Sequence, residues 1–278
     1  MEIIQGALQS SLYRNKMQIN IIIYIVAFIF GAIIGSFLNV VIFRLKINKD
    51  DKAKINLRGR SKCPHCQKTL DAFELIPILS YFVLGGKCRG CKKPISYQYP
   101  LVEFISALLT VLPIYLWGFS HIYIYLIIPI FYLFIIIFFY DLKNFIIPDV
   151  LLVLLFLIIL IFDIIKLGRS EISLVNLFWG VIIGGGLFLL LVIFSREKWM
   201  GWGDVKLGFL LGLLLGYPYI VVSLFLSFIS GALVSIILIF AYGRKLKSQI
   251  PFAPFLILGA MIAIFWGEKI INWYLGGF

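Results

Sequence analysis

Two aspartates in this sequence lie at the ends of long apolar segments, where a carboxylate can do chemistry at a membrane surface. Asp141 directly follows the run YLIIPIFYLFIIIFFY, and Asp204 lies in a turn flanked by Gly201 and Gly203, between two further apolar runs. Hydrocarbon strongly disfavours an ionised carboxylate, so an acid at such a position either marks the membrane boundary or has a functional role. The glycines let the backbone of the turn approach a second segment closely. We therefore predict that Asp141 and Asp204 meet at one membrane face and form the catalytic pair of an aspartic protease.

A close pair of carboxylates supplies both the acid and the base that peptide hydrolysis needs. Two carboxylates about 3 Å apart cannot both stay ionised, so the pair shares one proton. The ionised member takes a proton from water as the water attacks a peptide carbonyl, and the protonated member donates to the carbonyl oxygen. A third acid, Asp149, follows Pro148 in the loop after Asp141. We interpret Asp149 as a helix cap rather than a catalytic group, and expect Pro148, Asp149 and Lys206 to support the active-site loops.

The composition is that of a membrane protein. Hydrophobic residues make up 62% of the 278-residue chain, charged residues 14%, and the mean hydropathy is +1.04. These values exclude an ordinary soluble domain. The formal net charge is +12, but the basic residues lie between apolar runs rather than on one soluble face. We therefore attribute them to membrane orientation and to contact with anionic lipid headgroups, and expect no nucleic-acid partner.

Runs of roughly 20 apolar residues, each long enough to cross a bilayer as a helix, recur along the chain. They predict an all-α polytopic membrane protein with about eight transmembrane helices and one small polar insertion. The first run, at about residues 19–43, is too long for the apolar core of a signal peptide. We expect an N-terminal segment with the first span (residues 1–43), a basic insertion (44–99) and a membrane-embedded peptidase domain (100–278).

The insertion contains all four cysteines of the chain in two CxxC pairs: Cys63 and Cys66, then 21 residues, then Cys88 and Cys91. Thiolates at this spacing can fill a tetrahedral zinc site, and a site closed by four cysteines is structural rather than catalytic. The alternatives are disulfides, which a cytosolic location disfavours, or a redox pair, which the presence of two pairs disfavours. We expect His65, inside the first pair, to be exposed rather than a ligand.

The basic residues also predict which side of the membrane each loop faces. From residue 44 to about residue 100 there are thirteen Lys and Arg against four acids, so the positive-inside rule makes this insertion cytoplasmic. Alternation of the spans then assigns twenty Lys and Arg to cytoplasmic loops and five to the opposite side. The same alternation places Asp141, Asp149 and Asp204 on the cytoplasmic face, as a catalytic pair requires.

Several motifs occur in an order that closely resembles the bacterial type IV prepilin peptidases, over roughly residues 25–260. They are GSFLNVVIFRL, SKCPHC, PILSYFVLGGKCRGCKKPISYQYPLVE, the Asp141 loop closing in Ile-Pro-Asp149, GWGDVKL and PFAPFLILG. The resemblance implies an inner-membrane aspartic protease of the GxGD type that is also an N-methyltransferase. In the pattern of that family, the first Asp of the loop and the Asp of GxGD form the catalytic pair. These positions are Asp141 and Asp204, and Asp149 is not one of the pair.

The resemblance also implies substrates and a cofactor. Members of the family cut type IV prepilins and related pseudopilins on the cytoplasmic side, after a glycine that ends a short basic leader. They then methylate the new N-terminal residue with S-adenosylmethionine. This sequence has no glycine-rich cofactor loop, so the first span and the insertion would have to build the methyl-donor site, with Gly35, Asn39 and Glu103 as candidates. Simpler interpretations are an interhelical hydrogen bond for Asn39 and a favourable interaction with the helix dipole for Glu103.

Two positions depart from the common pattern of the family, and two other classes of protein stay open. Tyr140 and Ala253 stand where many members have another apolar residue and a glycine, respectively. One alternative is a presenilin-type GxGD intramembrane protease, against which the cysteine-rich insertion and the Ile-Pro-Asp sequence argue. The other is an ion-coupled transporter, which predicts acids deeper in the spans and broken helices.

Overall fold

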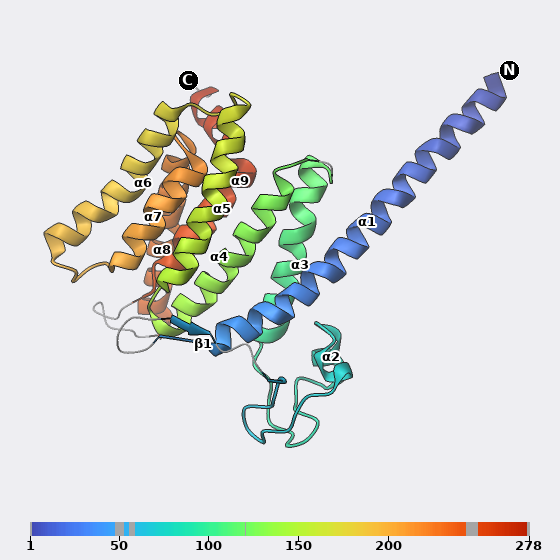
Figure 1. The fold of residues 1–278 in the computed structure, drawn as a ribbon, viewed down its shortest axis with the longest axis horizontal. Coiled ribbons are helices and arrows are strands. Elements are labelled where there is room, and N and C mark those ends of the chain that lie inside the picture. The colour runs from blue at the N-terminus through green and yellow to red at the C-terminus, as the bar shows by residue number, and fades with distance from the viewer. Residues whose placement is uncertain (1, 48–52, 56–58, 120, 243–249, 277–278) are drawn as a thin grey trace. The chain divides into compact units, whose positions relative to one another are not determined.

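The computed structural model describes residues 2–47, 53–55, 59–119, 121–242 and 250–276, which are mostly helical (Figure 1). In chain order the elements are α1 (Glu2–Arg44), β1 (Leu45–Ile47), β2 (Ala53–Ile55), η1 (Ala72–Leu75), α2 (Leu79–Val83), α3 (Gln98–Trp117), α4 (Ile124–Asn144), α5 (Asp149–Gly168), α6 (Leu174–Ser195), α7 (Trp202–Leu215), α8 (Tyr219–Tyr242) and α9 (Ala253–Gly276). Strands β1 and β2 pair in a small two-stranded sheet. The predicted helical architecture with one small insertion is confirmed.

Seven of the described helices are long and apolar enough to cross a membrane: α1 over Ile21–Arg44, together with α3, α4, α5, α6, α8 and α9. The remaining predicted segment, the sixth in chain order, corresponds to α7, which has only 14 residues. At 1.5 Å per residue it is about 21 Å long, shorter than the roughly 30 Å hydrocarbon layer. Gly216 ends this helix with a φ of +67°, a conformation that glycine adopts without steric cost. The chain is therefore a multi-pass membrane protein in which one predicted segment is too short to span by itself.

The chain separates into two compact units, each with its own packing. The first consists of Met1–Leu45 and Ile55–Tyr132, and the second of Lys46–Lys54 and Leu133–Phe278. The first unit contains most of the basic insertion and the four cysteines. The second contains the three loop aspartates, so each unit holds one of the two groups of residues singled out by the sequence.

In the first unit α1 packs against α3. A Cβ atom at Gly31 would lie 2.7 Å from the Cα of Ala107, and one at Gly35 would lie 2.7 Å from the Cα of Glu103. Real side chains cannot approach backbone that closely, so both positions need glycine. The close helix packing that the spacing of these two glycines predicts is confirmed.

In the second unit the short helix α7 contacts four others, α5, α6, α8 and α9. Its side chains Leu207 and Leu211 are fully buried. Helices α6 and α7 meet through glycines, because a Cβ at Gly184 would lie 2.5 Å from the carbonyl oxygen of Gly208 and 3.0 Å from the Cα of Gly212. This enclosure fixes the first turn of α7, which carries Asp204.

The α6–α7 contact provides a stability test with a control on the same helix. Gly184→Ala places a methyl group against the backbone of α7, and we expect it to destabilise the protein by about 1–3 kcal/mol, as overpacking does. A Cβ at Gly186 would meet only a methyl carbon of Ile182 at 4.0 Å. Gly186→Ala should therefore be neutral or stabilising, by up to about 1 kcal/mol from helix propensity. Thermal unfolding followed by tryptophan fluorescence in detergent would contradict this if the two variants melted alike.

Candidate functional site

Asp141 lies in the last turn of α4 and is buried, with 5% of its surface exposed. The backbone amide of Ala253, the first residue of α9, donates a hydrogen bond to its carboxylate. The N-terminus of a helix carries partial positive charge and free N–H groups, which favour a carboxylate there. The Oδ2 atom of Asp141 has no hydrogen-bond partner among the described residues. One oxygen is thus held by the protein while the other is left for a proton or a reacting molecule.

Asp204 is the third residue of α7, directly after the glycine-flanked turn. Its own N–H donates to the carbonyl oxygen of Gly201 at 3.2 Å, and the amide of Gly201 donates to its carboxylate. A Cβ at Gly203 would lie 3.2 Å from the Cβ of Ile147. A larger residue at 203 would push the turn away from the loop that follows Asp141. The two glycines therefore have distinct roles, one in holding the carboxylate and one in close approach of the loops.

The two predicted acids are near enough for the charge of one to act on the other. Burial and then the negative charge of the Asp141 carboxylate raise the pKa of Asp204 from its ordinary value to about 7. A charge shifts a neighbouring pKa in this way only at short range, because the interaction falls with distance and with solvent screening. Two carboxyl groups in this relation could supply the acid and the base that hydrolysis requires.

The third acid, Asp149, lies outside this pair. Its exposed carboxylate accepts a hydrogen bond from the ammonium group of Lys206 at 2.7 Å. The expectation that Asp149 caps α5 is wrong: Pro148 occupies the cap position, no side-chain cap hydrogen bond is present, and Asp149 is the first helical residue. There its charge still complements the helix dipole. The ion pair links the start of α5 to the second turn of α7, and an exposed pair of this kind contributes at most about 1 kcal/mol.

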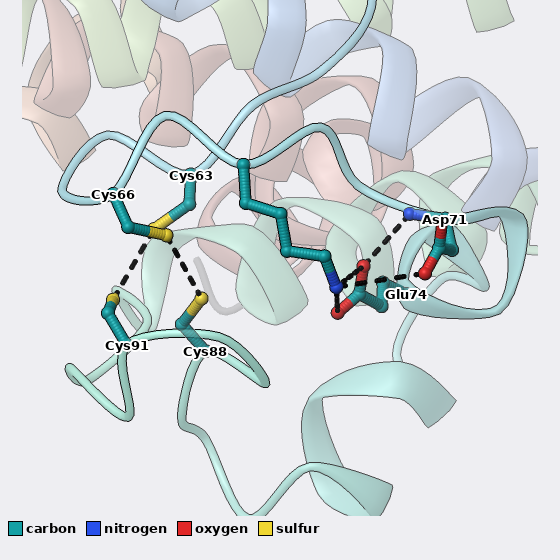
Figure 2. Close-up of polar contacts among 7 residues, drawn as sticks. Cys63, Cys66, Asp71, Glu74, Cys88 and Cys91 are labelled. Atoms are coloured by element: carbon teal, nitrogen blue, oxygen red, sulfur yellow. Dashed lines mark hydrogen bonds and ion pairs between the residues drawn. The ribbon is translucent and has the colours of Figure 1, made fainter.

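The four cysteines of the insertion converge on one point (Figure 2). Their sulfur atoms lie within 4.8 Å of one another, with 3.9 Å between Cys63 and Cys91 and 4.0 Å between Cys66 and Cys88. In a tetrahedral site with Zn–S bonds of 2.3 Å the sulfurs are about 3.8 Å apart, so the cluster fits zinc. All four thiols are free in the structure. The exposed His65 is not part of the cluster.

The two CxxC pairs are built as matching knuckles. In the first, the N–H of Cys63 donates to the carbonyl oxygen of Lys68 and the N–H of Gln67 donates back to Cys63; in the second, Cys88, Lys93 and Lys92 repeat this pattern. The fourth residue after each first cysteine has a positive φ, 58° at Gln67 and 59° at Lys92. The backbone amides of Cys91 and Gly90 point at the Cys88 sulfur and lower the pKa of that thiol to about 6. Amides that stabilise a thiolate prepare a metal ligand.

A small ionic cluster beside the cysteines was not anticipated from the sequence. The ammonium group of Lys68 lies 3.4 Å from the Glu74 carboxylate and 3.7 Å from that of Asp71, and Glu74 also accepts the N–H of Asp71 at 2.9 Å (Figure 2). Asp71 and Glu74 form a capping box around η1. The spacing Asp-x-x-Glu is a known signal for such a box and could have revealed it. The cluster ties the first knuckle to η1.

The three candidates for a methyl-donor site all lie at the α1–α3 contact. The space beside Gly35 is occupied by α3, which packs closely against it. Asn39 is 1% exposed and donates to the carbonyl oxygen of Tyr99 at 3.1 Å, while its Oδ1 has no partner among the described residues. Glu103 is buried and accepts the N–H of Ile78 at 2.6 Å. Glu103 belongs to the second turn of α3, so its simplest role is to hold the segment before α2 rather than to face the helix dipole.

Comparisons with known proteins agree with this arrangement. Residues 29–117 match the bacterial peptidase A24 N-terminal domain, and residues 128–236 match the type IV leader peptidase family. Proteins described as prepilin leader peptidase/N-methyltransferase are 34% identical in Legionella pneumophila, covering 91% of this chain and 94% of the relative, and 35% identical in Aeromonas hydrophila, covering 90% and 93%. A protein of the same description from Bacillus subtilis (strain 168) is 32% identical, covering 90% and 97%. No solved structure gave a significant match.

Proposed function

The chain belongs to the type IV leader peptidase family, and on that premise we propose that it cuts the leader from type IV prepilins or pseudopilins with Asp141 and Asp204. The single observation that carries this proposal is the placement of the two acids: Asp141 is buried at the end of α4 beside the amide of Ala253, and Asp204 lies in the first turn of α7, near enough for the charge of Asp141 to act on it. The relatives are named prepilin leader peptidase/N-methyltransferase, which supports the substrate class. The basic insertion favours a cytoplasmic position for the site. A transporter is not favoured, since both acids lie where their helices end or begin.

Each acid has a defined part in the proposed hydrolysis. The ionised carboxylate of the pair takes a proton from water as the water oxygen attacks the peptide carbonyl, and the protonated carboxyl donates to the carbonyl oxygen. As the tetrahedral intermediate collapses, the carboxyl that took a proton from water gives it to the leaving amine and the C–N bond breaks. A hydroxyl group of the intermediate returns its proton to the other carboxylate, which restores the pair. The amides of Ala253 and Gly201 hold the two carboxylates in place throughout.

The shared proton predicts how cleavage depends on pH. Because the pKa of Asp204 is raised to about 7, the pair keeps its proton below that pH and loses it above. We therefore expect the rate of cleavage to fall as the pH rises through about 7 to 8, when both carboxylates are ionised and neither can act as an acid. Initial rates in bilayers, with thermal unfolding measured at each pH to exclude denaturation, would contradict this if activity continued to increase up to pH ~9.

A second activity, transfer of a methyl group to the new N-terminus, is proposed from the names of the relatives, with S-adenosylmethionine as the methyl donor. The free Oδ1 of buried Asn39 supports a binding role for the α1–α3 contact. In this proposal Asn39 would accept a hydrogen bond from the donor, and Glu103 would position the adjoining segment through Ile78. Zinc is proposed as the metal of the four cysteines, with a structural role.

Co-reconstitution with a prepilin in lipid bilayers tests both activities in one experiment. Mass spectrometry of the pilin should show loss of the leader after its terminal glycine, and a further gain of one methyl mass when S-adenosylmethionine is added. Cleavage without methylation would support the proposed peptidase activity and contradict the proposed methyltransferase activity. If several prepilins and pseudopilins all stay intact while the reconstituted protein is folded, the proposed function is wrong.

A further inference from the structure

The basic insertion contains an apolar segment that the catalytic and metal sites do not use. Residues 75–86, with the sequence LIPILSYFVLGG, carry no charged side chain. Around η1 and α2, Phe73 is 81% exposed, Phe82 70% and Val83 84%, and Leu79 is exposed as well. None of these residues belongs to a membrane-spanning helix. Side chains this large and apolar, clustered on one short segment, mark a surface that is covered by something other than water.

Two contacts place this segment beside the start of α3. The N–H of Ile78, which immediately precedes α2, donates to the buried carboxylate of Glu103 at 2.6 Å. Glu103 lies five residues after Gln98, the first residue of α3, and therefore about 7.5 Å along that helix. The ring of Tyr81 lies 5.9 Å from that of Tyr97, just before α3. Helix α2 is thus held at the level where the α3 span begins.

That level is the membrane interface. Interfacial segments bury their apolar face about 5–10 Å into the boundary between headgroups and acyl chains, and tyrosines gather there. Exposed basic side chains flank the apolar segment on both sides in sequence: Lys62, Lys87, Arg89, Lys92 and Lys93. This combination of apolar and cationic side chains matches an anionic lipid surface. A prepilin leader is a poorer partner, because the short basic leader of the proposed substrate would be repelled by the same charges.

We propose that η1 and α2 form a membrane-interface anchor, in which Phe73, Leu79, Phe82 and Val83 insert among lipid chains and the flanking lysines and arginine contact anionic headgroups. The anchor holds the zinc knuckles at the bilayer surface. The ion pairs of Lys68 with Asp71 and Glu74 tie the first knuckle to η1 and so hold that knuckle near the anchor.

Site-specific photo-crosslinking in the full-length protein tests the proposal. The photoreactive residue p-benzoylphenylalanine would replace Phe82 in one variant and Thr69, an exposed residue of the first knuckle, in a matched control. In nanodiscs that contain phosphatidylglycerol we expect lipid adducts at 82 several-fold more often than at 69, detected by mass spectrometry. We expect the yield at 82 to fall several-fold in nanodiscs of phosphatidylcholine alone. Both variants should retain zinc, which verifies that the insertion is folded.

Three results would overturn the proposal. Equal lipid labelling at 82 and 69 would mean that the segment faces water. Equal labelling at 82 in the two lipid compositions would remove the role of anionic headgroups. If an added prepilin captured the crosslinker at 82 in place of lipid, the apolar segment would be a docking surface for the substrate. These outcomes do not depend on proteolysis, so they are independent of whether Asp141 and Asp204 are catalytic.

Discussion

Asp141→Asn and Asp204→Asn are each expected to abolish cleavage of a reconstituted prepilin, with rates at least about 10²–10⁴-fold below the wild type. An amide cannot take a proton from water at neutral pH, nor can it share a proton with its neighbour. Replacing either member therefore leaves a single carboxyl group, which cannot supply the acid and the base at the same time. The side chains are nearly isosteric, so the hydrogen bonds from Ala253 and Gly201 can persist and the fold should be retained. The measurement is the mass of the pilin product over time.

Asp149→Asn is the matched control, because Asp149 follows the same loop as Asp141 but is exposed and paired with Lys206. We expect this variant to lose no more than about the free energy of an exposed ion pair, up to 1 kcal/mol or roughly fivefold in rate. If Asp149→Asn were inactive while Asp204→Asn still cleaved the prepilin at the wild-type rate, the assignment of the pair would be wrong. All three variants should unfold at similar temperatures, which separates catalysis from folding.

The sequence singles out Asp141 and Asp204 as the predicted pair for a physical reason. Hydrocarbon excludes carboxylates, so Asp141 and Asp204 stand out where apolar runs end, and glycines beside Asp204 indicate a close approach. What holds Asp141 could not be predicted in the same way. Its partner is a backbone amide at Ala253, the first residue of α9, and every helix N-terminus has such amides. Only the folded packing decides which one faces the acid.

The lengths of the helices and the surface of the insertion show a second limit of prediction from the sequence. Hydropathy detects apolar residues but not where a helix ends, so it predicts a span at α7 although Gly216 stops that helix after 14 residues. The sequence shows the regular spacing of the glycines that let α7 pack against α6, but it does not show which residues each glycine contacts. Similarly, the apolar residues of α2 were hidden among the many charges of the insertion. Their exposure is a property of the folded chain, and the hydrogen bond from Ile78 to Glu103 places them beside the start of α3.

Loss of a single zinc ligand should have the largest effect on the first unit. Backbone hydrogen bonds close each cysteine knuckle separately, and the sulfur atoms of all four cysteines face one point. Metal binding in such sites contributes folding free energy directly, about 10–16 kcal/mol in small zinc domains. We therefore expect Cys88→Ser to reduce bound zinc from about one equivalent per chain to near zero, because serine is a much poorer ligand for zinc than a thiolate.

The same substitution should release the knuckles from their fixed conformation. Amide hydrogens of Cys63 and Gln67, which belong to the opposite knuckle, should exchange with solvent at least about tenfold faster, since only the metal joins the two halves through sulfur. His65→Ala, in an exposed residue outside the cluster, is the control and should keep both its zinc and its protection from exchange. Zinc retained by Cys88→Ser, or lost by His65→Ala, would show that the metal is held by a different set of ligands. Elemental analysis and hydrogen exchange of the purified full-length protein decide between these outcomes.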